Sequence, residues 1–236
     1  SSIYLFDTDA STSPTRATLV SGATNSTPTT VNSVIVSPND RHLICLGANQ
    51  FNTTADPNGT FEPMLVKWSN QEDLTNWVPS LSSTAGENVL TDGTQIIGGV
   101  RSRNAINIWT DNSLWTMTFV GPPFTFAVNL INEGAGLIGP KGAVTTDSGI
   151  YFMSYGNFYV YNGSVQKLPC TVLNYVFSDF NDGQAYKVHA FSNSENNEIG
   201  WFYVSSSATE IDRYVIYNTQ EQVWYYGNLE RTAWLD

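Results

Sequence analysis

The sequence predicts an all-β protein, a β-propeller built from four-stranded antiparallel blades. Three observations lead to this prediction. Ser, Thr, Asn and Gly are abundant while charged residues make up only 13% of the chain, as in turn-rich β proteins. Short segments alternate apolar and polar residues between clusters of turn residues. One hairpin pattern also recurs at the spacing of propeller blades, which is about 40 to 50 residues.

The recurring hairpin is clearest in INIWTDNSLWTM, Ile106 to Met117. Side chains alternate along a strand, so Ile106 and Trp109 are expected on opposite faces. Asp111 begins a bend, because Asp and Asn cap backbone amides in turns and tolerate left-handed geometry. IYFMSYGNFYVY, Ile150 to Tyr161, repeats the plan without the Asp. We therefore interpret Asp111 as a turn residue rather than a catalytic or metal-binding residue.

A four-strand template finds about four blade-like units, with a partial unit on either side of them. The units cover about 31–79, 94–131, 141–168 and 187–229. The first is read as the strands VNSVIVSP, HLICLGAN and MLVKWS, followed by the turn NQEDLTN and a last strand WVP. CTVLNYVFSDFN, Cys170 to Asn181, has helical spacing instead and predicts a short helix between blades. We therefore predict one propeller domain, 1–236, as an incomplete part of a longer protein.

Aromatic side chains are expected to hold the blades together, since each buries about 150 to 250 Å² and apolar burial is worth roughly 25 cal/mol per Å². Trp68 and Trp77 flank the polar turn in WSNQEDLTNW, and we expect the two indoles to pack together. In GPPFTF, Pro122 and Pro123 end a strand and set a rigid corner, which is either a subunit contact or a protected blade edge. The other candidates for structural or interaction roles are Trp109, Asp111, Tyr159, Trp201, Trp224 and Trp234.

The sequence offers no catalytic, cofactor or metal site. Its two histidines, His42 near a turn and His189 in the strand pattern KVHAF, are more simply structural. No GxSxG, HExxH, Walker or dinucleotide motif occurs, and neither FDTDAS nor DFNDGQ has the spacing of a calcium loop. Cys45 and Cys170 lack the spacing of zinc ligands, which favours free buried thiols. We therefore predict that the protein is not an enzyme.

The charge of the chain disfavours ordinary nucleic-acid binding. Ten basic against 21 acidic residues give a net charge of −11, so phosphates would meet little positive surface. An acidic wall can nevertheless let DNA pass without holding it, because no counterions are released. No apolar run reaches the roughly 18 residues of a membrane-spanning helix.

Several segments, in the same order, resemble the tail hub or nozzle proteins of short-tailed bacteriophages, which are also called packaged-DNA stabilisation or tail accessory proteins. The resemblance is carried by WSNQEDLTNWVP with the following AG, RNAINIWTDNSLWTMTFVGPPFTF, LIGP with DSGIYFMSYGNFYVYNG, NEIGWFYVSSSATEIDRYVIYN and VWYYGNLERTAW. It covers most of the chain from about Val31 onward and leaves out residues 1–30 and 52–63.

This resemblance implies a structural virion protein of the phage tail, with a propeller fold and no catalytic turnover. Members of the family assemble as a ring, usually of six copies, below the portal and adaptor proteins. The ring closes or extends the DNA exit channel, stabilises packaged DNA and carries tail fibres or a needle. DNA would pass without sequence-specific binding, and an acidic lumen would ease its ejection by repelling phosphates.

Two other classes of function remain open. Trp, Tyr and Asn side chains would suit a carbohydrate-binding or sialidase-like propeller, but the three-arginine cluster of sialidases is missing and only Arg101 and Arg103 lie together. A secreted adhesive propeller is the second class, and it would use the N-glycosylation sequons at Asn25, Asn52, Asn58 and Asn162.

Overall fold

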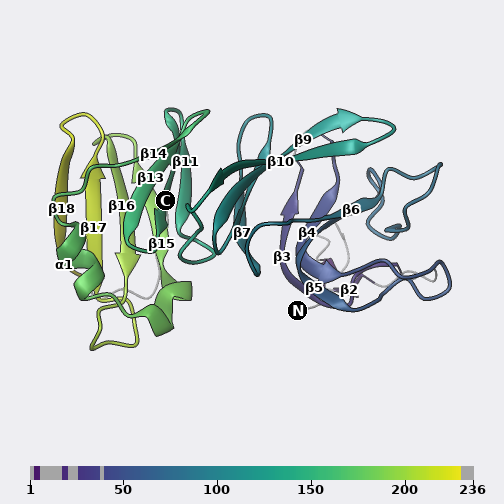
Figure 1. Ribbon diagram of the computed structural model, residues 1–236, viewed down its shortest axis with the longest axis horizontal. Coiled ribbons are helices and arrows are strands. Elements are labelled where there is room, and N and C mark those ends of the chain that lie inside the picture. Colours follow the sequence, from purple (N-terminus) through teal and green to yellow (C-terminus); the bar gives the residue numbers. More distant parts are fainter. Residues whose placement is uncertain (1–2, 6–17, 21–25, 38–39, 230–236) are drawn as a thin grey trace, which may run out of the picture. The chain divides into compact units, whose positions relative to one another are not determined.

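The computed structural model describes residues 3–5, 18–20, 26–37 and 40–229 of the chain. This part is mostly β and contains four antiparallel sheets of four strands each (Figure 1). A two-stranded sheet precedes them and pairs β1 (Tyr4–Leu5) with β2 (Thr18–Leu19). The prediction of an all-β protein made of four-stranded antiparallel sheets is confirmed.

Within each sheet the strands follow one another in chain order, so every sheet is a simple meander. The first sheet contains β3 (Val31–Val36), β4 (Leu43–Asn49), β5 (Phe61–Trp68) and β6 (Gly86–Val89). The second contains β7 (Ile96–Arg101), β8 (Ile106–Thr110), β9 (Ser113–Gly121) and β10 (Thr125–Glu133). The third contains β11 (Ala143–Thr146), β12 (Gly149–Ser154), β13 (Asn157–Tyr161) and β14 (Val165–Lys167). The fourth contains β15 (His189–Asn193), β16 (Glu198–Tyr203), β17 (Arg213–Asn218) and β18 (Val223–Asn228).

Both hairpins expected from the repeated pattern are present. β8 and β9 are joined at Asp111 and Asn112, where Thr110 Oγ1 accepts a hydrogen bond from the N–H of Asn112 at 3.1 Å. β12 and β13 are joined at Tyr155 and Gly156, and Gly156 has a φ of 74°, which glycine adopts without strain. In the second hairpin the strands pair antiparallel from Ile150 with Tyr161 to Ser154 with Asn157.

The last strand of the first sheet lies later in the chain than predicted. It is β6, whereas Trp77 to Pro79, the predicted strand, belong to the loop between β5 and β6. In this loop Asn70 Oδ1 accepts a hydrogen bond from the N–H of Thr84 at 2.9 Å, and Asp73 Oδ1 accepts one from the N–H of Thr75 at 2.9 Å. Such local side-chain bonds satisfy backbone groups that a strand would pair in a ladder.

The short helix predicted within 170–181 is present as α1 (Leu173–Ser178). It is followed by a 3₁₀ helix, η1 (Asp182–Lys187). Asn181 begins η1, because its side chain accepts a hydrogen bond from the N–H of Gly183 at 3.1 Å. No helix among the described residues has the length and apolar character needed to cross a membrane.

The chain divides into two compact units. The first unit contains the sheet β3–β6 and residues 116–129. Its core is a cluster of buried side chains: Ile3, Val31, Leu43, Cys45, Ala48, Leu65 and Trp77. The indole N–H of Trp77 donates to the backbone O of Leu74 at 2.8 Å, so the polar group of this buried ring has a hydrogen-bond partner.

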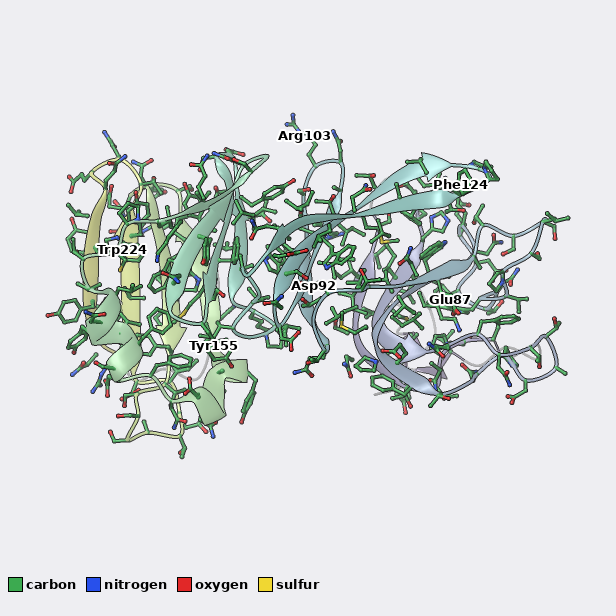
Figure 2. The ribbon with its side chains drawn as sticks, in the orientation of Figure 1. Glu87, Asp92, Arg103, Phe124, Tyr155 and Trp224 are labelled. Carbon is green, nitrogen blue, oxygen red and sulfur yellow. The ribbon has the colours of Figure 1, made fainter. Side chains whose placement is uncertain are left out.

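In the second unit the sheet β11–β14 is covered on both of its faces. Along β12, Met153 faces one cluster of buried side chains and Phe152 faces another. The first cluster includes Trp201 and Trp224 of the sheet β15–β18, of which Figure 2 labels Trp224, and the second includes Trp109 of β8. Successive segments of the chain therefore stack on one another through their apolar faces in this unit.

The first strands of the third and fourth sheets lie side by side. Lys141, which precedes β11, forms a parallel bridge with His189, the first residue of β15. The N–H of Ala190 donates to the backbone O of Lys141 at 2.8 Å. The two sheets are thus joined at their first strands as well as through their faces.

Candidate functional site

A long hairpin formed by β9 and β10 carries apolar side chains into solvent. Both strands have nine residues, whereas β8 has five and β7 has six. We refer to residues 116–129, the part of this hairpin that belongs to the first unit, as the arm. Figure 2 shows Phe124 at the tip of the arm.

The tip forms where the sequence GPPFT interrupts the alternation of the two strands. Gly121 has a φ of 77°, and Thr125, on the other side of the tip, has a φ of 60°. Pro122 and Pro123 have no N–H to donate, so the ladder of hydrogen bonds stops between them. The N–H of Phe126 donates to the backbone O of Phe124 at 2.7 Å and closes the turn. The predicted proline corner is therefore the exposed end of a hairpin.

The arm is apolar and uncharged at its tip. The side chains of Phe124 and Val120 are 77% and 54% exposed, and both prolines are exposed. The sequence from Asn112 to Asn132 contains no Asp, Glu, Lys, Arg or His, although the chain has 21 acidic residues. Charged side chains usually protect edge strands from pairing with other chains, and β10, at one end of its sheet, has none before its last residue, Glu133.

The underside of the arm is fixed to the first sheet by aromatic contacts. Phe126 meets the indole of Trp68 edge-on, with ring centroids 5.4 Å apart. The same phenyl ring lies 5.1 Å from the imidazole of His42 and 5.6 Å from Phe119. Edge-to-face aromatic pairs of this kind add about 0.5 to 1.5 kcal/mol beyond their buried area. The arm therefore has an anchored base and a free tip.

His42 is a neutral part of this anchor. Its Nε2 lies 3.0 Å from Thr84 Oγ1, and that hydroxyl donates its one proton to Asn70 Oδ1 at 2.9 Å. The imidazole therefore donates to the hydroxyl, which fixes the tautomer with the proton on Nε2. Burial lowers the pKa of His42, and Asp40 nearby opposes this shift only in part. A neutral ring packed on phenyl groups has a structural role, as predicted from the sequence.

The two tryptophans of WSNQEDLTNW lie in different places. Trp68 packs on Phe126, and its indole N–H donates to the backbone O of Thr84 at 2.8 Å. Trp77 instead fills the core of the first unit. The expected packing of one indole on the other is wrong, because the strand that was meant to bring Trp77 alongside Trp68 is a loop.

The other aromatic candidates lie in the core of the second unit. Trp109 and Tyr159 contact Phe152, with ring centroids 5.2 and 5.3 Å away. Trp201 and Trp224 contact Phe158, at 4.9 and 4.8 Å. These rings serve as packing between sheets and expose little surface to a partner. Trp234 lies outside the described residues.

Asp111 occupies the turn between β8 and β9, and its backbone is closely approached by Gly136. A Cβ on Gly136 would lie 2.1 Å from the carbonyl O of Asp111, so this position accepts only glycine. The segment after β10 thus passes directly against the turn. This contact agrees with the structural role that we assigned to Asp111.

The described residues contain no group of three or more His, Cys, Asp or Glu side chains that could hold a metal ion. Asp179 and Asn181 of DFNDGQ make turn and cap contacts, with Ser206 Oγ donating to Asp179 Oδ1 at 3.0 Å. The acidic residues of FDTDAS lie outside the described residues.

Cys45 is buried, which raises its pKa to about 12, whereas Cys170 is only half-buried. The prediction of a buried thiol is therefore confirmed for Cys45 and wrong for Cys170.

Sequence reasoning identified the prolines of the arm but missed Phe124 and Val120 as its exposed apolar residues. The absence of charge from Asn112 to Asn132 is the signal that could have found them.

No family model and no curated protein matches this chain, so the function rests on its own residues and geometry.

Proposed function

We propose that this chain is a structural virion protein of a bacteriophage tail, a tail hub or nozzle subunit that assembles as a ring. The observation that carries the proposal is the arm, which presents an uncharged apolar tip from an anchored base. Phe124, at 77% exposed, is the side chain best placed to enter a neighbouring subunit. Aromatic residues are enriched in subunit interfaces and charged residues are depleted from their cores.

Charge explains why the contact would be made by the arm. Copies of a chain with a net charge of −11 repel one another wherever acidic surfaces meet. The arm is a place where two copies can meet without bringing like charges together. A contact between different surfaces of successive copies generates a ring when the rotation closes. The arm and its acceptor surface would form such a contact.

The stacking of the sheets supports a propeller architecture for the subunit. Propeller blades are four-stranded meanders that pack face to face and place their first strands at the centre. All four large sheets are meanders, β11–β14 is covered on both faces, and β11 and β15 are adjacent. We infer that the four sheets are four blades of a propeller.

In the phage tail this ring would lie below the portal and adaptor proteins and line or close the DNA exit channel. It would act through its shape, carry fibre or needle proteins and stabilise packaged DNA. The acidic composition of the chain suits a wall that DNA passes without being held. The order of the segments that resemble phage tail hub proteins supports this role over a sugar-cleaving or adhesive propeller.

Negative-stain electron microscopy of the purified protein tests the proposal. We expect class averages that show a ring with a central channel, because the arm links each copy to the next. Single particles of one chain at every protein concentration would contradict it. A hydrolase screen with glycoside substrates gives an independent check, and turnover by the purified protein would favour the sialidase-like alternative.

A further inference from the structure

Four side chains from three elements form a compact group on the sheet β15–β18. The rings of Tyr175 and Tyr226 lie with centroids 4.3 Å apart. Beside them Arg213 Nε lies 3.3 Å from Asp179 Oδ2. We refer to these four residues as the tyrosine–arginine cluster. It is separate from the arm and has no part in the proposed ring contact.

The helix spacing and the strand register bring these four residues together. Tyr175 lies in α1 and Asp179 ends it four residues later, so both project from the same side of the helix. In the sheet, Arg213 pairs with Asn228 and Tyr226 pairs with Val215, which puts Arg213 and Tyr226 on one face. α1 lies beside β17 and β18, as Figure 1 shows, and brings its two residues to that face.

The cluster combines accessible aromatic rings with hydrogen-bonding groups. Tyr175 is 43% exposed and Tyr226 is 49% exposed, although each already contacts the other. The side chains of Arg213 and Asp179 are both partly exposed next to them. Carboxylates and guanidinium groups are planar, and each can bond two neighbouring hydroxyl groups at once. The surface thus offers an apolar platform with an acceptor and a donor at its edge.

A second observation shows unused hydrogen-bonding capacity beneath the cluster. Tyr203 is fully buried, and its hydroxyl has no hydrogen-bond partner among the described residues. Tyr203 pairs with Arg213 across the strands, so the two side chains lie on the same face of the sheet. Buried hydroxyls in proteins nearly always have a partner, so the phenol of Tyr203 adds hydrogen-bonding capacity next to the cluster that no described residue uses.

The charge balance of the cluster selects the kind of ligand. Arg213 is held by Asp179 and also by Asp212, whose Oδ2 lies 3.0 Å from Nη1. Asp212 is further fixed by Ser205, whose hydroxyl donates to it at 2.7 Å. Two carboxylates against one guanidinium leave a negative balance, which disfavours an anionic ligand. A neutral ligand rich in hydroxyl groups fits the cluster best.

We propose that the tyrosine–arginine cluster binds a neutral hexopyranoside. The apolar face of the sugar ring packs on the exposed outer side of the Tyr175–Tyr226 pair. Adjacent hydroxyl groups accept hydrogen bonds from Arg213 and donate to Asp179. This inference gives the sugar-binding alternative a specific location, without any hydrolytic function.

Saturation-transfer-difference NMR on the full chain tests the site, with the methyl α-glycosides of glucose, galactose and mannose as probes and N-acetylneuraminic acid as the anionic comparison. We expect at least one neutral glycoside to receive saturation and the anionic sugar to receive none. Tyr226→Ala removes half of the platform, and we expect the transfer signal to fall at least fivefold. Tyr226→Phe keeps the ring and should retain the signal, which separates stacking from loss of the phenol.

Two further variants make the result specific. Asp179→Asn keeps the shape of the side chain but removes its charge, and we expect weaker binding than in the wild type. Tyr155→Ala removes another exposed tyrosine, at the β12–β13 turn, and should bind as the wild type does. Circular dichroism melting of each variant shows that it is folded. The proposal is overturned if no neutral glycoside receives saturation, or if a folded Tyr226→Ala variant binds as tightly as the wild type.

Discussion

Lys67 is a fully buried cation in the first unit. Its Nζ donates to the backbone O of Asn49 at 3.0 Å and lies 3.6 Å from Glu87 Oε2. Glu87 Oε2 also accepts the N–H of Phe51 at 2.8 Å, so one carboxylate connects a loop to the buried amine. Burial lowers the pKa of Lys67, and the attraction of Glu87 opposes that shift. Lys67 therefore connects the end of β4 to β6 through its contacts with Asn49 and Glu87.

We expect Lys67→Ala to destabilise the protein by about 2 to 4 kcal/mol, because it leaves a cavity and removes the partner of the Asn49 carbonyl. Lys67→Met keeps the buried volume and loses only the polar contacts, which should cost about 1 kcal/mol. Urea unfolding followed by tryptophan fluorescence measures both free energies. Equal losses in the two variants would show that packing of the side chain is unimportant.

His42 makes stability depend on pH. Its pKa is lowered in the folded protein, so the folded state binds fewer protons than the unfolded state between the folded pKa and 6.5. Stability therefore rises with pH through this window and is lost as pH falls below 6.5. The slope from one proton cannot exceed about 1.4 kcal/mol per pH unit.

Urea unfolding between about pH 7.5 and 5.5 checks this dependence, since most carboxylates stay ionised there. We expect the unfolding free energy to fall toward the acid end in the wild type. His42→Gln should flatten the curve. An unchanged slope in His42→Gln would assign the dependence to other groups.

Residue-scale contacts were the least predictable part of the molecule. Lys67 occupies an ordinary alternating position in MLVKWS, and nothing in the sequence shows that Glu87 pairs with it across the sheet. The pairing depends on the register between β5 and β6, and the sequence pattern had misplaced the latter strand. By contrast, the turn role of Asp111 needs only local chemistry and could be inferred from the sequence.

At the scale of elements, the arm combines a part that the sequence predicts with a part that it does not. The prolines at 122 and 123 signal an interrupted strand, and the structure places them at a hairpin tip. The exposure of Phe124 follows from the length of β9 and β10 relative to their neighbours, which local patterns do not give. The pattern also favoured the loop at Trp77 over β6, because the loop contains the apolar segment WVP whereas β6 reads GENV.

We expect the double substitution Val120→Asp with Phe124→Asp to separate the copies of the chain. It places two negative charges on the tip, where contact between subunits would bury them at high cost. Because both side chains are exposed, the unfolding free energy should change by less than about 0.5 kcal/mol. Size-exclusion chromatography with light scattering measures the assembly, and urea unfolding measures the stability.

Leu81→Asp is the matched control, since Leu81 is a fully exposed apolar residue outside the arm. It should leave the assembly intact. If the double variant assembles as the wild type does, the arm is not the subunit contact, and the ring is built through another surface. This outcome therefore separates the role of the arm from the proposed function itself.

At the scale of the whole molecule, the repeat was the most informative feature of the sequence. The hairpins that begin at Ile106 and Ile150 occupy equivalent positions in consecutive sheets, as β8–β9 and β12–β13. Strand order within each sheet follows directly from this repeat. The packing between sheets does not, because it depends on which aromatic rings meet, such as Phe158 with Trp201 and Trp224.

The central claim is that this chain is a ring-forming structural subunit, and native mass spectrometry of the purified protein tests it most directly. We expect one dominant species whose mass is six times that of the 26.0-kDa chain. Its population should increase with protein concentration and disappear in the Val120→Asp, Phe124→Asp variant. A species of 26.0 kDa at every concentration would contradict the claim.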